Sequence, residues 1–196
     1  FSYAGFQYVQ LENFPGTPTT NSVVACEVHS DVPVIGSFTC SNPLLNAIHD
    51  ACWRTVLNNL HSIPTDCPMF EKRGWTADAL LFSAQASDNF GMDSFFAKWM
   101  YDLADTQTAA GEIADVAPGP DGSLDLSWTS AFVVIPWRLY QEYGDRTVIA
   151  AHYDRMKRYV DYLSTKSTNH LVTGFYGDWV SPGYVPPPEG PDLVAG

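Results

Sequence analysis

The sequence has 196 residues, of which 45% are apolar and 16% are charged, a balance typical of an ordered globular protein. Its formal net charge of −12 disfavours nucleic acid and anionic membranes as partners, because both would repel it. No apolar run approaches the roughly 20 residues that a membrane-spanning helix needs. The chain begins at Phe1 without a visible signal peptide, so we expect its natural N-terminus to be missing.

Residues 1–40 alternate apolar and polar side chains in the way that predicts β-strands. The alternation covers Phe6–Leu11, Val23–His29 and Val34–Thr39. Three strands are a poor independent fold, so we expect them to end a larger sheet. The four cysteines include no C-x-x-C pair, so the sequence does not favour a metal site. Cys26 and Cys40 are the best candidates for a disulfide, and Cys52 is expected to be a buried thiol.

From Ser41 the apolar period changes to three and four residues, which predicts helices. Asn42 can cap the first helix with Pro43 at its first position, and that helix should stop near Ser62. Four more helices are expected over about 75–90, 92–108, 128–143 and 146–164. Pro136 should kink the fourth helix or mark its start, and Gly144 should separate it from the fifth.

The segment from Thr65 to Asp78 reads Thr-Asp-Cys-Pro-Met-Phe-Glu-Lys-Arg-Gly-Trp-Thr-Ala-Asp and contains Asp66, Glu71, Trp75 and Asp78. A Trp face stacks on the C–H face of a sugar, while carboxylates bind hydroxyls and one protonates a glycosidic oxygen. Asp66 and Asp78 would oppose ionisation of Glu71, as a general acid needs at neutral pH. The segment also fits a Pro-bounded loop before a helix whose dipole the acidic residues simply suit.

Three other places contain residues suited to sugar binding. The Gly111–Pro118 loop is rich in acidic and small residues, although it also fits a solvated loop with a helix cap. Trp128 opens the fourth helix, a position that is more often core than ligand. Asp178 and Trp179 lie in a Gly-containing loop, where an aromatic side chain is harder to explain as core. Trp53, Trp99 and Trp137 lie within helices and are expected in the core.

The order Asp-Cys-Pro, then Glu-Lys, then Gly-Trp-Thr-x-Asp closely resembles the signature of the inverting α-L-rhamnosidases, glycoside hydrolase family 78. The resemblance implies that Glu71 is the general acid and that Asp66, Asp78 and Trp75 hold the rhamnose. The family usually has Arg where this chain has Phe70, a departure that bears on loop anchoring or substrate choice and leaves the carboxylates untouched. It also often has Gly at the position of Ala77.

The resemblance extends to the other loops. The Gly111–Pro118 segment is similar to the family's Gly-x-Ile-x-Asp-Val-x-Pro, which lines the substrate side of the barrel. Ser130 departs from the common Trp-x-Asp-Ala after Trp128, and the Gly-Asp-Trp containing Asp178 and Trp179 matches one that the family places near the sugar. Trp75, Trp128 and Trp179 would then form an aromatic cage for a deoxysugar, whose 6-methyl group is an apolar target.

The implied fold is mainly α: a partial (α/α)6 toroid of about five helices, preceded by a few strands of a β-sandwich. Residues 1–40 would end the β-sandwich domain, and residues 41–196 would be the N-terminal part of a barrel of twelve helices. The family's general base is a Glu on a later barrel loop, although Glu112, Asp115 and Asp178 could in principle face the acid. We therefore expect these residues alone to be inactive and to need the remainder of the enzyme chain.

The sequence thus predicts an inverting glycosidase that releases terminal non-reducing α-L-rhamnose from glycosides or polysaccharides without a cofactor or a metal. Secretion is favoured weakly by low charge density and the cysteines. Two alternatives stay open. One is another (α/α)6-barrel hydrolase, trehalase-like or acting on uronides. The other is a non-catalytic sugar-binding module that uses the aromatic cage alone.

Overall fold

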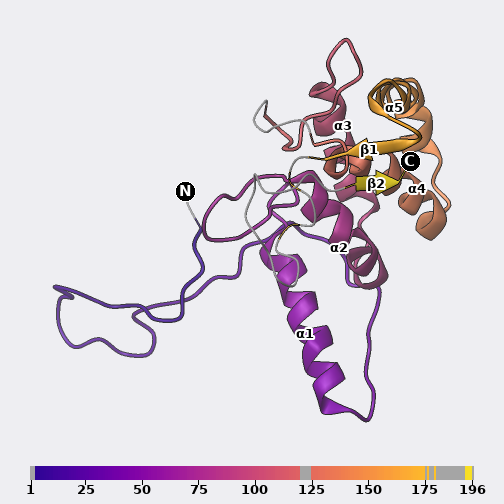
Figure 1. Cartoon of the computed structure of the whole chain (residues 1–196). Coiled ribbons are helices and arrows are strands. Elements are labelled where there is room, and N and C mark those ends of the chain that lie inside the picture. The colour runs from indigo at the N-terminus through magenta and orange to yellow at the C-terminus, as the bar shows by residue number, and fades with distance from the viewer. Residues whose placement is uncertain (1–2, 120–124, 175, 177–178, 180–192, 196) are drawn as a thin grey trace.

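The computed structural model describes residues 3–119, 125–174, 176, 179 and 193–195 (Figure 1). Its helices are α1 Pro43–Asn58, α2 Thr76–Asn89, α3 Asp93–Asp105, the 3-10 turn η1 Trp128–Ser130, α4 Ala131–Tyr143 and α5 Thr147–Lys166. Two short strands, β1 Leu171–Thr173 and β2 Leu193–Ala195, form an antiparallel pair. The fold is therefore mainly α, and the prediction of five helices is confirmed.

The helix ends follow from local chemistry. The Asn42 side chain accepts a hydrogen bond from Leu44 N at 3.0 Å, and Pro43 occupies the first turn of α1, as predicted. Gly144 ends α4 in the left-handed region at φ 67°, where a residue without Cβ is least strained. Pro136 lies inside α4, so it does not mark the start of that helix, which instead follows directly after η1.

Helices α2 to α5 pack into one bundle around α4. Helix α4 contacts α2, α3 and α5, and α3 also contacts α5. Their facing side chains make the core, which includes Phe96, Trp99, Phe132 and Ile135, all with 0% exposure. The arrangement brings the N-terminal end of α2 beside η1 at the start of α4. The loops that precede these two helices therefore meet at one end of the bundle.

The strands predicted in residues 1–40 are not formed in the part of this segment that the structure describes. Residues 3–40 run as extended chain, and a single bridge pairs Val34 with Phe90, next to hydrogen bonds from Ile35 N and Gly36 N to Asn89 O. Figure 1 shows this segment making a long excursion away from the helices. An alternating pattern needs neighbouring strands to form a ladder, and here they are not in place. The assignment of 1–40 to a β-sandwich stays a prediction.

Several expectations about the cysteines and about burial were wrong. All four cysteines are free, so Cys26 and Cys40 form no disulfide, and Cys52 is exposed. The outer end of α1 extends away from the bundle, which leaves Leu44 and Ile48 exposed although they belong to its apolar stripe (Figure 1). Trp99 is buried as expected, whereas Trp137 is 51% exposed on α4. Among the described helices, none has both the length and the apolar character needed to cross a bilayer.

Candidate active site

The loop that carries the acidic cluster closes on itself. Asp66 N donates to Arg73 O at 3.0 Å, and Arg73 N donates to Asp66 Oδ1 at 2.8 Å, so one residue closes the loop with both its backbone and its side chain. Glu71 N donates to Cys67 Sγ at 3.2 Å inside this ring. The turn holds Glu71 at the surface, where its carboxylate is exposed. One oxygen of Asp66 is thus already engaged by the loop.

The Gly111–Pro118 loop pairs with the residues that lead into α2. Trp75 and Val116 form an antiparallel bridge, Thr76 N donates to Asp115 O at 2.8 Å, and Ala117 N donates to Gly74 O at 2.9 Å. A Cβ added at Gly74 would lie 2.0 Å from Ala117 O, so only glycine permits this approach. This pairing fixes Trp75 at the N-terminal end of α2.

Glu71 and Trp75 are joined directly. The Trp75 indole Nε1 donates a hydrogen bond to Glu71 Oε2 at 2.8 Å. The indole therefore orients the carboxylate and occupies one of its oxygens. Because the donor ring belongs to the residue proposed to bind sugar, the predicted acid and the predicted stacking surface are parts of one unit.

The three carboxylates of the segment also act on one another electrostatically. Burial raises the pKa of Asp78 from 3.8 to about 6. The charges of Asp66 and Glu71 add to this rise, and a backbone hydrogen bond opposes it. Asp78 lies in the first turn of α2, where the helix dipole favours a negative charge. The structure thus brings Asp66, Glu71 and Asp78 within electrostatic range, and the raised pKa belongs to Asp78.

The three tryptophans of the predicted cage lie close together, and a fourth ring lies among them. Ring centroids lie 5.4 Å apart for Trp75 and Trp128, and 6.2 Å apart for Trp128 and Trp179. Tyr176 lies among them, 4.6 Å from Trp128, 5.7 Å from Trp75 and 5.9 Å from Trp179. Trp179 is 51% exposed, which leaves a face for a ligand. Asp178 lies outside the described residues.

Sequence reasoning missed Tyr176 and Asp125. Tyr176 could have been found from its place three residues before Trp179, in the same Gly-containing loop. Asp125 offers no such signal, because a single Asp in a polar loop resembles any turn residue. Its carboxylate is fully buried and receives hydrogen bonds from the loops on both sides. These contacts of Asp125 become visible only in the folded chain.

The two acidic residues of the Gly111–Pro118 loop, Glu112 and Asp115, are held by contacts away from Glu71. Asp115 has 0% exposure, and this burial raises its pKa to about 7. The negative charge of Asp125 raises the pKa further, whereas the hydrogen bond from the Asp125 backbone lowers it. Glu112 accepts a hydrogen bond from the Tyr162 hydroxyl on α5. These contacts hold Asp115 inside the protein and Glu112 against α5. In the described part of the chain, no three His, Cys, Asp or Glu side chains are grouped to hold a metal ion.

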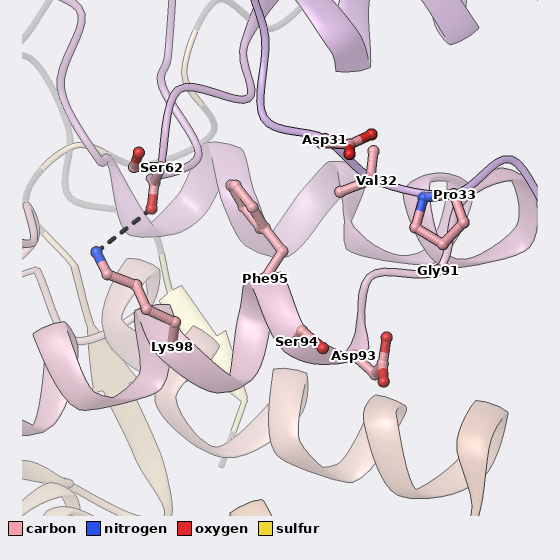
Figure 2. Close-up of a pocket in the computed structure, with 9 residues that line it drawn as sticks. All are labelled: Asp31, Val32, Pro33, Ser62, Gly91, Asp93, Ser94, Phe95 and Lys98. Carbon is pink, nitrogen blue, oxygen red and sulfur yellow. Dashed lines mark hydrogen bonds between the residues drawn. The ribbon is translucent and has the colours of Figure 1, made fainter.

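A hollow of about 460 Å³ lies elsewhere, between residues 31–33, Ser62 and the start of α3 (Figure 2). Its charged groups are Asp31, Asp93 and Lys98, and Lys98 Nζ donates to Ser62 O at 3.3 Å and to Asp102 on its own helix. No side chain of the Glu71 cluster lines it. We place the candidate site at Glu71 because the acid and the stacking rings occur together there.

Comparisons with known proteins identify the family to which the chain is similar. The family model described as the bacterial alpha-L-rhamnosidase 6 hairpin glycosidase domain matches residues 33–193. The chain is 37% identical to an alpha-L-rhamnosidase of Streptomyces avermitilis, in a match that covers 92% of this chain and 18% of the relative. It is 33% identical to an alpha-L-rhamnosidase of Formosa agariphila, in a match that covers 93% of this chain and 20% of the relative. It spans about one fifth of the length of these curated relatives.

Two solved structures show the same likeness in three dimensions. The alpha-L-rhamnosidase of Dictyoglumus thermophilum superposes with a TM-score of 0.85 at 40% identity, over 89% of this chain and 20% of that one. The Streptomyces avermitilis enzyme complexed with L-rhamnose gives a TM-score of 0.80 at 37% identity, over 85% of this chain and 17% of that one. The likeness covers most of the helix bundle, in which the loops before α2 and α4 meet at one end. The chain belongs to the bacterial α-L-rhamnosidase six-hairpin glycosidase family.

Proposed function

We propose that this chain supplies the general acid and part of the sugar site of a glycoside hydrolase that releases terminal, non-reducing α-L-rhamnose. The observation that supports this most strongly is the hydrogen bond of 2.8 Å from Trp75 Nε1 to Glu71 Oε2, beside the four-ring cluster. It joins a surface carboxylate to a stacking surface, which is the combination that acid-catalysed glycoside cleavage requires.

Each group has a role that its contacts suit. Glu71 Oε2 accepts the indole hydrogen bond, so Oε1 is the oxygen that carries the proton to the departing glycosidic oxygen. Trp75, Trp128, Tyr176 and Trp179 provide apolar faces for the sugar ring and for the 6-methyl group of rhamnose. Asp66 and Asp78 accept hydrogen bonds from sugar hydroxyls, and Asp78, with a pKa near 6, can also donate one when protonated.

An inverting mechanism needs a second carboxylate about 6.5–9.5 Å from the acid, across the sugar, to activate water. Of the three residues expected to be able to face Glu71, Asp115 is buried, Glu112 is bonded to Tyr162, and Asp178 lies outside the described residues. We therefore propose that the base comes from the remainder of the enzyme chain. Rhamnose-containing glycosides or polysaccharides are the proposed substrates, and an extracellular location stays a proposal that no contact in this chain addresses.

The decisive experiment replaces Glu71 by Gln in the full-length protein and compares two rhamnosides that differ in leaving group. Gln cannot donate the proton, so turnover of an alkyl rhamnoside should fall by at least about a hundredfold, within the range known for general acids. Turnover of a nitrophenyl rhamnoside should change far less, because that leaving group departs without protonation. Steady-state kcat for the two substrates is the measurement.

Matched controls separate the alternatives. Glu112→Gln removes a carboxylate on a neighbouring loop that lies against α5, so it should leave the ratio of the two kcat values unchanged. Hydrolysis of glucosides or uronides in place of rhamnosides would replace this function with that of another barrel hydrolase. Rhamnose binding with no turnover of any glycoside by the wild-type protein would make it a sugar-binding module. Equal losses on both leaving groups would remove Glu71 from the acid role.

A further inference from the structure

Asp125 is a buried carboxylate to which the proposed chemistry assigns no function. It has 0% exposure and lies next to Asp115, which is equally buried. Its backbone N donates to both oxygens of Asp115, at 2.8 Å and 3.0 Å. A charged group in such a place is costly unless its oxygens accept several hydrogen bonds. The donors that supply these bonds therefore show what the carboxylate is for.

The donors to Asp125 are the backbone N–H groups of Trp128, Tyr176 and Ser127, together with the Ser127 hydroxyl. Oδ1 accepts from Ser127 N at 2.9 Å, from Ser127 Oγ at 2.5 Å and from Trp128 N at 3.3 Å. Oδ2 accepts from Tyr176 N at 2.7 Å. One carboxylate thus joins the loop before η1 to a loop about fifty residues later in the chain. The rings of Trp128 and Tyr176 lie 4.6 Å apart on these two anchored backbones.

We propose that Asp125 is the positioning residue of the aromatic cage: by holding the backbones of Trp128 and Tyr176 on its two oxygens, it sets the spacing of the rings that bind the sugar. This inference rests on the proposed rhamnosidase function, since it concerns the same site. Asp125 touches no substrate. It acts through the two rings, so its effect is on sugar binding and not on proton transfer from Glu71.

Space around the carboxylate supports the same role. A Cβ added at Gly174 would lie 2.7 Å from Asp125 Oδ1, 2.8 Å from Oδ2 and 2.9 Å from Ser127 Oγ. The chain that leads to Tyr176 therefore passes directly over the carboxylate, and glycine is the residue that lets it do so. Two different changes can disturb the anchor: one alters its chemistry at residue 125, and the other pushes it aside from residue 174.

The first test is Asp125→Asn in the full-length protein, assayed on nitrophenyl α-L-rhamnoside. An amide has one acceptor oxygen, so either Tyr176 N or the Ser127–Trp128 side loses its partner and faces an N–H group. We expect KM for the rhamnoside and Kd for L-rhamnose to rise about tenfold while kcat stays within about threefold, which is the pattern of lost binding. Tryptophan fluorescence should also change, since Trp128 is displaced.

The second variant, Gly174→Ala, keeps every charge and should reproduce the rise in KM. The control is Asp145→Asn, because the Asp145 carboxylate accepts from Thr147 N at 2.8 Å at the start of α5 and takes no part in the hydrogen bonds to Asp125. It should lower stability slightly and leave KM unchanged. If wild-type protein does not bind L-rhamnose, the proposed function fails. If it binds and both Asp125→Asn and Gly174→Ala keep a wild-type KM, or lose kcat alone, the positioning role is wrong.

Discussion

At the scale of single residues, Trp75 has two functions that are usually separate. Its indole N–H holds the Glu71 carboxylate, and its ring lies edge-on to Trp128 and Tyr176 at 5.4 Å and 5.7 Å. A sugar that stacks on this ring is therefore placed relative to the acid by one rigid side chain. Preorganisation of this kind lowers the cost of orienting the reacting groups.

Replacing Trp75 by Phe separates the two functions, because Phe keeps an aromatic ring and has no N–H. Without its donor the Glu71 carboxyl loses its fixed orientation, so kcat/KM for rhamnosides should fall roughly tenfold, as for loss of a hydrogen bond to a charged group. Trp137→Phe is the matched control, since Trp137 is exposed on α4 away from the site. Equal kcat/KM for Trp75→Phe and Trp137→Phe would contradict a role for the indole N–H.

At the scale of elements, the site depends on the approach of two loops at Gly74. Gly74 and Ala117 exchange close backbone contacts, and an added Cβ would lie 2.0 Å from Ala117 O. Gly74→Ala should therefore cost about 3 kcal/mol of stability, the upper end of the range for forced overpacking, and it should lower kcat by moving Trp75. Urea unfolding and steady-state kinetics are the measurements.

Gly144→Ala provides the comparison for that prediction. Gly144 has φ 67° and no atoms within 4 Å of an added Cβ, so its substitution should cost about 1 kcal/mol from backbone strain alone. It should leave kcat unchanged, because the end of α4 does not carry the site. A Gly74→Ala protein no less stable than Gly144→Ala would show that the two loops can separate freely.

The elements that the sequence predicted well are those whose pattern is local. The five helices follow from apolar spacing, Asn42 and Gly144, and the Glu71 segment follows from residues adjacent in the chain. What could not be predicted depends on distant partners. The strands expected before residue 40 need neighbours that are not in place, and Asp125 acquires its role only where residues 127 and 176 meet. Trp137 repeats the helical period of a core residue, yet it lies on the outer face of α4.

At the scale of the whole molecule, apolar surface is unevenly distributed. The bundle of α2 to α5 encloses a continuous core, whereas Leu44 and Ile48 on α1 and Phe6 and Tyr8 in the extended segment are exposed. Contiguous exposed apolar surface commonly marks places where other protein surfaces pack. Apolar burial is therefore complete inside the helix bundle and incomplete at the far end of α1.

Charge is the second property of the whole molecule, and it predicts how stability responds to pH. Burial raises the folded pKa of two carboxyls above the ordinary value of 3.8, to about 7 for Asp115 and to about 6 for Asp78. The ionisable groups that face Asp115 are Asp125 and Tyr159, and those that face Asp78 are Asp66 and Glu71. Because the folded state keeps these protons while the unfolded state releases them, the stability that these two carboxyls contribute should be fully present below about pH 4 and should be lost as the pH rises to about 7. The formal charge of −12 acts in the same direction.

Asp115→Asn tests this directly, since Asn keeps the shape of a protonated carboxyl and cannot ionise. At pH 8 the variant should be more stable than wild type by on the order of 2–4 kcal/mol, from the raised pKa of Asp115, and near pH 4 the two should be equal. Urea unfolding followed by tryptophan fluorescence at both pH values measures the difference. Asp145→Asn should give the opposite sign, because hydrogen bonds from Thr147 lower the pKa of Asp145 and its stabilising charge is present above pH 4. A gain for Asp115→Asn that is the same at pH 4 and pH 8 would mean that packing, and not ionisation of the buried pair, limits the stability of the fold.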